Sequence, residues 1–381
     1  MASKKISTWE AVMLIAGSGL GTGILAIPYA ASKTGLLGII TAVVAAFVAS
    51  ALMHLLVVDL VLNSKNSTQL MGIFKEHLFK GKNERLYSSL FFAVLAVVLL
   101  FNLAIYILVA AEVLTESFGV APFISKIIFY CTSSLIVVAG IKIIGISEKY
   151  SMIIIGGVVL FLIVMSLNHP VKNMELSFGS YGDALALYGL VMFSFSALFS
   201  IPQAANNIED KNKLKTAVIT GIGINAAITL IFTVSSITAS KNITQVATIG
   251  LSSSLGNITA FVCSVFVILA MFTSYLSIAL AQLDIISTEL KVKRNTAFID
   301  ATVPSLLAAL FLPVSFISMI QVVGGVVAVI TSLLVIPGYI KATEHSNGNL
   351  MLGNLGKNKV LLNIVLASYI LMAVSSLIKL S

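Results

Sequence analysis

The sequence predicts an all-α membrane protein with eleven transmembrane helices. The 381 residues are 58% hydrophobic and only 10% charged, whereas a soluble domain carries about 25% charged residues. The apolar runs are long and continuous, which is typical of membrane helices, because membrane strands alternate between apolar and polar residues. Helix breakers recur at two places inside these runs, and they divide the chain into related halves.

Each predicted span is an apolar run near or above the roughly 20 residues that cross a bilayer as a helix. No loop between the spans is long enough for a soluble domain, so we expect a single membrane domain over 1–381. The predicted spans are 9–31, 36–62, 87–116, 123–141, 150–168, 184–205, 216–239, 257–285, 297–313, 317–340 and 360–378.

The placement of basic residues predicts the orientation in a cell membrane (inner or plasma membrane). Lys and Arg gather in cytoplasmic loops, and a cytoplasmic N-terminus with an outside C-terminus leaves few of the 23 basic residues outside. The net charge of +8 therefore reflects orientation, and we expect the lipid bilayer, not nucleic acid, as partner. The outer basic residues are Lys33, Lys126, Lys172, Lys241 and Lys379.

The helix breakers form two related motifs. "GSGLGTGILAIPYAA" (17–31) holds four glycines in seven positions and then a proline, and its tail "LAIPYAA" is echoed by "FSIPQAA" (199–205). Five spans separate the two motifs, so the same pattern runs in opposite directions through the membrane. This predicts an inverted repeat of about 9–168 and 184–340, with an extra helix at about 360–378.

Glycine and proline favour breaks in the first and sixth spans, around 17–23 and 195–201. Unpaired backbone at that depth is tolerated where it lines a polar cavity or is buried in protein. Freed N–H groups attract a carboxylate, and freed carbonyls attract an ammonium group or a metal cation. An amino acid supplies both charges; the alternative is close helix packing through small residues.

We therefore expect a substrate site at the two breaks. Tyr106 of the third span is added as a contact or cap, with the filling of a helix interface as its alternative. The candidate substrate-binding residues are Gly19, Gly21, Thr22, Gly23, Tyr106, Phe195, Ser196 and Phe199.

Parts of the sequence resemble a known family. "GTGILAIPYAASKTG" (21–35) resembles the first-span signature of the amino acid/auxin permease family. "IAGSGLGTGILAIP" (15–28) is similar to the first span of bacterial aromatic amino acid permeases, and "SIP" (200–202) matches their sixth. The resemblance implies a five-plus-five inverted-repeat fold of the leucine-transporter type with discontinuous helices 1 and 6. It also implies secondary amino acid symport by alternating access, not an enzyme.

The eighth span carries "AMFTS" (270–274), which is similar to an Ala-x-x-Thr-Ser arrangement in sodium-coupled relatives. The resemblance implies a metal site for sodium. A hard cation prefers oxygen ligands, and positions 270, 273 and 274 share one helix face. Alternatively, Thr and Ser bond back to a carbonyl one turn earlier. Sodium-coupled relatives carry Asn where this chain has Gly17. The implied ligands are the carbonyls of Gly17, Leu20 and Ala270 and the hydroxyls of Thr273 and Ser274.

Ionisable residues inside spans are candidates for proton coupling. Asp59, Glu112, Asp284 and Asp300 lie toward span ends, and no carboxylate is expected at a clear midplane position. This favours a sodium site of neutral oxygens over a central proton-carrying carboxylate. His54 and Asp59 are the proton candidates, with a packed helix-interface histidine as the alternative for His54.

Together these features predict a symporter of neutral L-amino acids that is coupled to sodium in preference to a proton. No fixed charge is expected at the centre to pair with a charged substrate, and no cofactor is expected beyond the coupling ion. The alternatives are a proton-coupled aromatic amino acid permease, a non-transporting amino acid sensor, a channel, and an intramembrane serine protease based on "GSG" (17–19) and His54.

Overall fold

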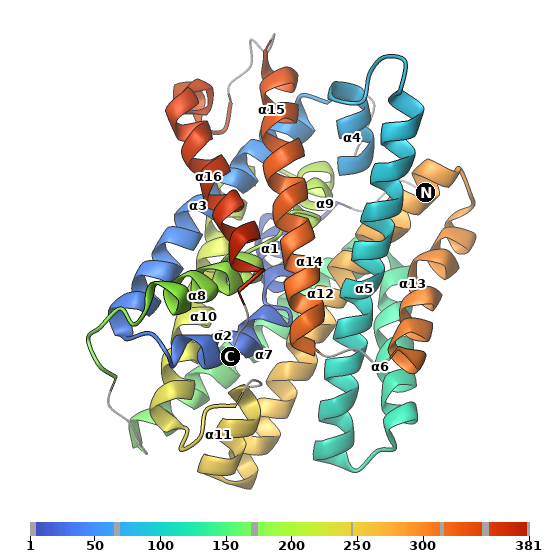
Figure 1. The fold of residues 1–381 in the computed structure, drawn as a ribbon. Coiled ribbons are helices and arrows are strands. Elements are labelled where there is room, and N and C mark those ends of the chain that lie inside the picture. Colours follow the sequence, from blue (N-terminus) through green and yellow to red (C-terminus); the bar gives the residue numbers. More distant parts are fainter. Residues whose placement is uncertain are drawn as a thin grey trace.

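The computed structural model describes residues 5–64, 69–168, 174–244, 247–312, 316–344 and 350–378. Over these residues the chain is a bundle of helices (Figure 1), and its one extended pairing is an isolated parallel bridge between Ile6 and Ile208. Within this described part, seven helices are long and apolar enough to cross a membrane, and the bent pair α1–α2 makes an eighth. The all-helical membrane fold is confirmed, while the count of eleven spans stays a prediction.

The first half of the chain supplies seven helices. Its first helix begins with a capping box, in which the Ser7 hydroxyl accepts from the Glu10 N–H at 3.2 Å and the Glu10 carboxylate accepts from the Ser7 N–H at 2.7 Å. The helices are α1 (Thr8–Gly19), α2 (Gly23–Ala31), α3 (Leu36–Leu62), α4 (Leu70–His77), α5 (Glu84–Phe118), α6 (Pro122–Ala139) and α7 (Ile141–Asn168).

The second half begins with another broken pair, α8 and α9. Its long helices α10 and α12 pack against the first half, and α14, η2 and α15 follow one another without a gap, η2 being one π-helical turn. The elements are α8 (Tyr181–Ser194), α9 (Ser200–Asn207), η1 (Lys211–Lys213), α10 (Leu214–Ala239), α11 (Ala247–Leu255), α12 (Asn257–Leu290), α13 (Arg294–Phe311), α14 (Phe316–Ile330), η2 (Thr331–Val335), α15 (Ile336–Thr343), η3 (Gly353–Lys357) and α16 (Lys359–Ser375).

Both predicted helix breaks are confirmed. The axis bends by 56° between α1 and α2, across the glycine-rich segment. The helix α8 ends at Ser194, and α9 begins at Ser200, just before Pro202. Glycine is required at position 19, because a Cβ there would lie 2.5 Å from the carbonyl oxygen of Ser194 and would overlap the amide of Asn225.

The helix α7 begins nine residues before the predicted span, at Ile141 instead of 150. The charged stretch 142–149 had suggested a loop, but it continues the helix. Lys142 pairs with Glu10 of α1 at 2.7 Å, and Glu148 is completely buried among the helices. A carboxylate that the predicted spans did not include, Glu148, is therefore buried within α7.

The helix α1 lies inside the bundle, where α7, α10 and α12 surround it (Figure 1). Every residue of α1 from Glu10 to Gly19 is buried. The helices around it expose large apolar side chains outward, which is expected of a surface that faces lipid. Examples are Val44 on α3, Leu90 on α5, Leu135 on α6 and Leu160 on α7.

The contact between α1 and α10 gives a test of this packing. A Cβ at Gly221 would lie 2.9 Å from Ile15 side-chain carbons and from the carbonyl oxygen of Val12, whereas one at Gly223 meets only Phe47, at 3.8 Å. We expect Gly221→Ala to lower the free energy of unfolding by about 1–3 kcal/mol through overpacking. Gly223→Ala should be neutral or stabilising, by up to about 1 kcal/mol. Equal thermal unfolding midpoints of the two variants in detergent would contradict this packing.

Candidate substrate and ion site

The two broken helices meet at the centre of the bundle. The Ser194 hydroxyl at the end of α8 donates to the carbonyl of Gly19 at 3.3 Å, and a Cβ at Gly23 would lie 3.2 Å from the Ser194 Cβ. Residues 19–23 are all buried, and so are 194–200 except for the half-buried Ser196. Two segments that lie far apart in the sequence therefore lie against each other inside the bundle.

Side chains of α3 and α10 take up the backbone groups freed by the α8–α9 break. The Ser50 hydroxyl donates to the carbonyl of Phe195 at 3.1 Å, and the Asn225 amide donates to the carbonyl of Ser194 at 2.8 Å. The N–H of Ala197 donates to Nε2 of His54 at 2.9 Å. The break is therefore held open by specific polar partners, which an unpaired backbone inside a membrane requires.

The contacts of His54 fix its protonation state. Nδ1 lies 2.6 Å from the carbonyl oxygen of Ser50, which can only accept, so Nδ1 carries the proton. Nε2 must then be the unprotonated acceptor of the Ala197 N–H. A second proton on the ring would remove this acceptor, so the geometry favours His54 as an anchor of the break over a proton carrier.

The start of α2 lies at the first break and has no side-chain cap. The N–H groups of Ile24 and Leu25 donate to the carbonyls of Gly21 and Thr22, at 3.3 Å each. Several buried side-chain oxygens at or beside the breaks have no hydrogen-bond partner among the described residues. These oxygens are Thr22 Oγ1, Ser200 Oγ and Asn102 Oδ1.

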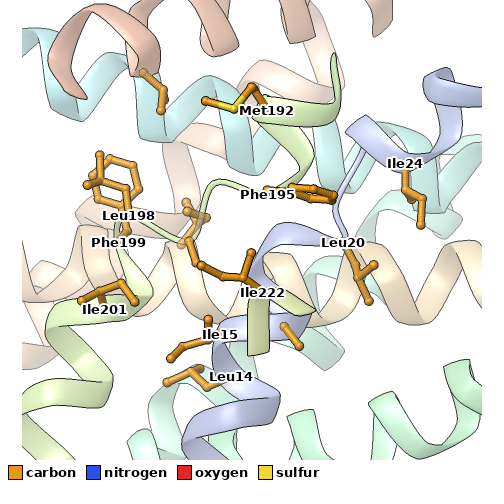
Figure 2. Close-up of a cluster of buried hydrophobic side chains, with 14 of the residues drawn as sticks. Leu14, Ile15, Leu20, Ile24, Met192, Phe195, Leu198, Phe199, Ile201 and Ile222 are labelled. Carbon is orange, nitrogen blue, oxygen red and sulfur yellow. The ribbon is translucent and has the colours of Figure 1, made fainter. Parts of the chain in front are cut away.

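Aromatic rings flank the start of α2. A Cβ at Gly21 would lie 2.9 Å from Tyr106 Cε1, and one at Gly23 would lie 3.3 Å from Phe193 Cδ1. Figure 2 shows the Phe195 ring beside the segment that joins α1 to α2. Phe199 lies on the other side of the view, next to Leu198 and Ile201. Ser196, between Phe195 and Phe199 in the break, is half-buried.

Four of the five predicted sodium ligands come together at the end of α1. The carbonyl of Gly17 accepts from the Thr273 hydroxyl at 3.3 Å and from the Ser274 hydroxyl at 3.1 Å. The Thr273 hydroxyl also lies 3.1 Å from the carbonyl of Ala270, one turn earlier. The Thr273 hydroxyl therefore has the contacts expected of a sodium ligand and also the hydrogen bond to its own helix that the alternative predicts. The fifth, Leu20, follows at the start of the break and is buried.

The sequence analysis missed Glu148, which lies against this cluster. Its Oε1 accepts from the Ser277 hydroxyl at 3.1 Å, and its Oε2 lies where a Cβ of residue 17 would be. A signal was present in the sequence, because helical spacing links Glu148 to the apolar positions of α7. The buried residues of this face are Ile144, Glu148, Ser151, Met152 and Ile155.

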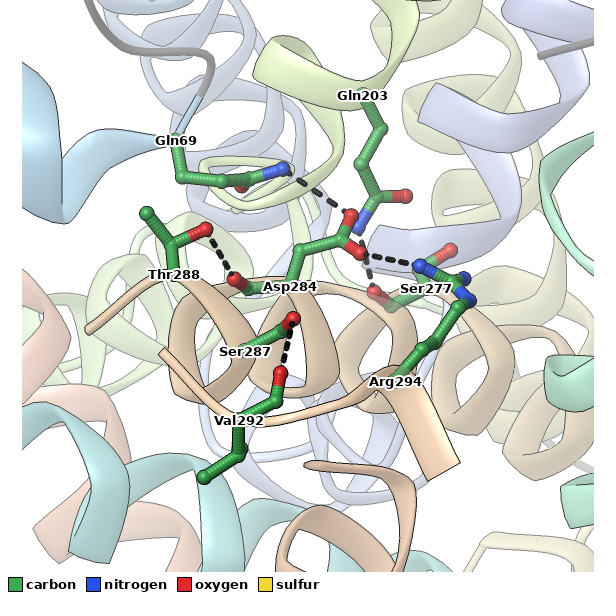
Figure 3. A network of polar contacts seen from close by, with 8 residues as sticks. All are labelled: Gln69, Gln203, Ser277, Asp284, Ser287, Thr288, Val292 and Arg294. Atoms are coloured by element: carbon green, nitrogen blue, oxygen red, sulfur yellow. Dashed lines mark hydrogen bonds and ion pairs between the residues drawn. The ribbon is translucent and has the colours of Figure 1, made fainter. Parts of the chain in front are cut away.

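Two carboxylates near span ends are engaged away from the breaks. Both oxygens of Asp59 accept from the N–H of Met351, at 2.9 and 3.1 Å. Asp284 near the end of α12 accepts from Gln69 at 3.2 Å and from Arg294 at 3.1 Å (Figure 3). These contacts tie loops to helix ends, so the proton-carrier role of Asp59 stays a prediction without support from its position.

The chain matches a known family of permeases over nearly its whole length. The model of the tryptophan/tyrosine permease family matches residues 4–376. The chain belongs to this family. The resemblance to permeases is thus confirmed, but the amino acid/auxin permease family was the wrong one to name. No curated protein sequence matches the chain.

Solved structures of two transporters share the fold of this permease. MhsT in complex with L-phenylalanine is 16% identical, with a TM-score of 0.69, covering 98% of this chain and all of MhsT. Mhp1, a nucleobase-cation-symport-1 family transporter in a closed conformation with bromovinylhydantoin bound, is 12% identical, with a TM-score of 0.71. That match covers 99% of this chain and 91% of Mhp1. Both have the leucine-transporter-type fold, and the predicted fold class is confirmed.

Family and fold together identify the chain as an amino acid transporter that passes several times through the membrane, and not as an enzyme. The intramembrane protease alternative is therefore dropped. The "GSG" segment (17–19) forms the last turn of α1, and His54 is bound to the backbone of Ser50 and Ala197.

The anchoring role of His54 can be tested by replacing it. We expect His54→Leu to lower stability by about 1–3 kcal/mol, because the buried Ala197 N–H loses its acceptor. His54→Gln should retain most of the stability, because the glutamine oxygen can accept the same hydrogen bond. The measurement is the thermal unfolding midpoint, with substrate uptake under a proton gradient as a second readout. A stable His54→Gln protein that no longer responds to the gradient would instead identify His54 as a proton carrier.

Proposed function

We propose that this permease is a secondary active symporter of neutral L-amino acids, above all those with an aromatic side chain, and that it works by alternating access. The observation that carries the proposal is the meeting of two helix breaks with opposite polarity. The uncapped N-terminus of α2 lies beside the C-terminal end of α8, where Gly23 faces Ser194. A helix N-terminus favours an anion and a C-terminus favours a cation.

An amino acid zwitterion fits this pair of helix ends. The substrate carboxylate would bind at the N-terminus of α2, where the helix dipole favours an anion. It would accept from the hydroxyl of Thr22, which has no partner among the described residues. The substrate ammonium group would bind carbonyls at the ends of α1 and α8. Gly19 and Ser194 offer such carbonyls, each already accepting one side-chain hydrogen bond and retaining a second lone pair.

The surrounding side chains support a neutral, aromatic substrate. Those that approach 19–23 and the α8–α9 break are uncharged, and three of them, Tyr106, Phe193 and Phe195, are aromatic. Aromatic rings favour stacked or edge-to-face contacts with another ring. The family's description and the L-phenylalanine bound to MhsT support the same class.

We propose sodium as the coupling ion, held at Gly17, Leu20, Ala270, Thr273 and Ser274. The carbonyl and hydroxyl oxygens of this group suit a hard cation. The N-terminus is proposed to lie in the cytoplasm of a cell (inner or plasma) membrane, because that orientation keeps most Lys and Arg inside. No cofactor is proposed beyond the ion.

The proposal is tested with the purified full chain in liposomes. Uptake of radiolabelled phenylalanine is measured under a sodium gradient alone and under a proton gradient alone. We expect saturable, sodium-driven accumulation that excess tryptophan or tyrosine inhibits and excess lysine or glutamate does not. Accumulation under the proton gradient alone would favour the proton-coupled aromatic permease. Binding without accumulation would favour the sensor, and flux without saturation would favour a channel.

Thr22 tests where the substrate carboxylate binds. We expect Thr22→Val to raise the KM for phenylalanine about 10- to 100-fold, because a hydrogen bond to a charged group contributes about 1.5–3 kcal/mol. Thr22→Ser keeps the hydroxyl and should stay within about threefold of the wild type. The thermal midpoint of Thr22→Val should not fall, because the hydroxyl has no hydrogen-bond partner to lose among the described residues. Equal KM values for both variants would exclude Thr22 from the substrate site.

A further inference from the structure

One carboxylate inside the bundle lacks a cationic partner. The helices α1, α7 and α12, which pack together around the end of α1, carry four carboxylates in all. Three of them are paired with a Lys or Arg. The fourth, Glu148, is 0% exposed, and its Oε2 has no hydrogen-bond partner among the described residues. The three ion pairs are Glu10–Lys142, Asp284–Arg294 and Glu289–Lys75.

The carboxylate of Glu148 takes the space of a side chain that residue 17 lacks. A Cβ built on Gly17 would overlap Glu148 Oε2 and would lie 3.3 Å from its Cδ. The carbonyl of the same glycine accepts from the hydroxyls of Thr273 and Ser274. Ser277, one turn beyond Thr273 on α12, donates to Glu148 Oε1 at 3.1 Å. Oxygens from α1, α7 and α12 therefore converge on one buried place.

A second unpartnered oxygen belongs to a residue at the edge of this group. Gln203 of α9 donates its amide to the carbonyl of Ser277 at 2.8 Å, and Figure 3 shows this contact. Its Oε1 is buried and has no partner among the described residues. Buried polar atoms are normally satisfied, so two free oxygens on either side of Ser277 indicate that the protein alone does not complete the group.

Charge limits what completes it to two choices, a proton on Glu148 or a bound cation. A buried, ionised carboxylate is costly unless a positive charge is close. A hard monovalent cation brings that charge and prefers carboxylate, carbonyl and hydroxyl oxygens as ligands. Neutral oxygens alone would leave a bound cation uncompensated, whereas one carboxylate makes the site electrically neutral.

We propose that Glu148 is a ligand of the coupling sodium ion and supplies the negative charge of its site. This rests on the proposed sodium symport and adds a residue on α7 to a site otherwise built from α1 and α12. Glu148 acts together with the carbonyl of Gly17 and the hydroxyls of Thr273, Ser274 and Ser277. Bound sodium therefore joins α7 to both α1 and α12.

The first test needs no transport. Thermal unfolding midpoints of the full chain in detergent are measured across a titration of sodium chloride, with choline chloride keeping the ionic strength constant. We expect sodium to raise the midpoint of the wild type, because a ligand that binds only the folded state stabilises it. Glu148→Gln should raise the sodium concentration for half-maximal effect at least tenfold. Without sodium it should be as stable as the wild type or more stable, because a buried charge without a partner has been removed.

Two further variants serve as controls. Glu148→Asp keeps the charge but withdraws it by one methylene, so its sodium requirement should lie between those of the wild type and Glu148→Gln. Glu112→Gln removes a carboxylate from an exposed position on α5 and should match the wild type. In liposomes, Glu148→Gln should lose sodium-driven accumulation of phenylalanine, and Glu112→Gln should keep it.

The outcomes separate this inference from the proposed function. A half-maximal sodium concentration for Glu148→Gln within twofold of the wild type would overturn the inference, even if sodium drives transport. The inference would also be overturned if sodium did not change the thermal unfolding midpoint of the wild type. A wild type that sodium stabilises through Glu148 but that accumulates no amino acid would retain the site and overturn the symport proposal instead.

Discussion

The structure depends on one constraint, which is that backbone groups released inside a membrane-spanning bundle must find polar partners. The chain breaks two helices at its centre, and each break releases N–H and carbonyl groups that lipid cannot satisfy. Ser50, His54 and Asn225 bind the groups released at α8–α9, and Thr273 and Ser274 bind those at the end of α1. The packing of α3, α10 and α12 around the breaks follows from this need.

The same arrangement bears on the proposed alternating access. Gly17 of α1 contacts α12 and lies against Glu148 of α7, whereas Phe195 and Ser194 accept from α3 and α10. The helix α10 contacts both breaks, because Asn225 also lies against Gly19. A ligand that bridges the two breaks therefore contacts elements that belong to different parts of the bundle. Interactions that differ between two arrangements of those parts are what allow a ligand to shift the equilibrium between them.

The sequence predicted the fold well because its signals were local. Long apolar runs gave the helices, and the paired glycine and proline motifs gave both breaks and the inverted repeat. Resemblance and helical spacing also predicted that Gly17, Ala270, Thr273 and Ser274 lie together, and the structure places them in one cluster. Phe199 was placed at the substrate site because it adjoins the break, but the direction of its side chain depends on how α9 packs. Family assignment rested on short motifs that related permeases share, and these could not separate one permease family from another.

Glu148 was missed for a reason that lies in its neighbours. Lys142 and Lys149 made 142–149 look like a cytoplasmic loop, because charge is the usual mark of a span boundary. Lys142 forms an ion pair with Glu10 of α1, so its charge is compensated within the bundle. The helix α7 therefore continues through this lysine. The alignment of Glu148 with Ile144, Ser151 and Ile155 was the better signal, since it places the carboxylate on the buried face of α7.

The buried polar residues near the breaks fall into two groups. Some use their polar atoms in hydrogen bonds to the backbone of the breaks, and others keep an atom that a ligand could bind. His54 and Asn225 use their ring and amide groups on backbone of the breaks, so replacing them changes the scaffold first. Thr22 and Glu148 each keep a buried oxygen that has no partner in the part of the chain that the structure describes. A buried serine or threonine elsewhere in a helix can satisfy itself with a carbonyl one turn earlier. A carboxylate has no hydrogen to donate, so buried Glu148 either holds a proton or pairs with a cation that binds, such as the sodium ion proposed above.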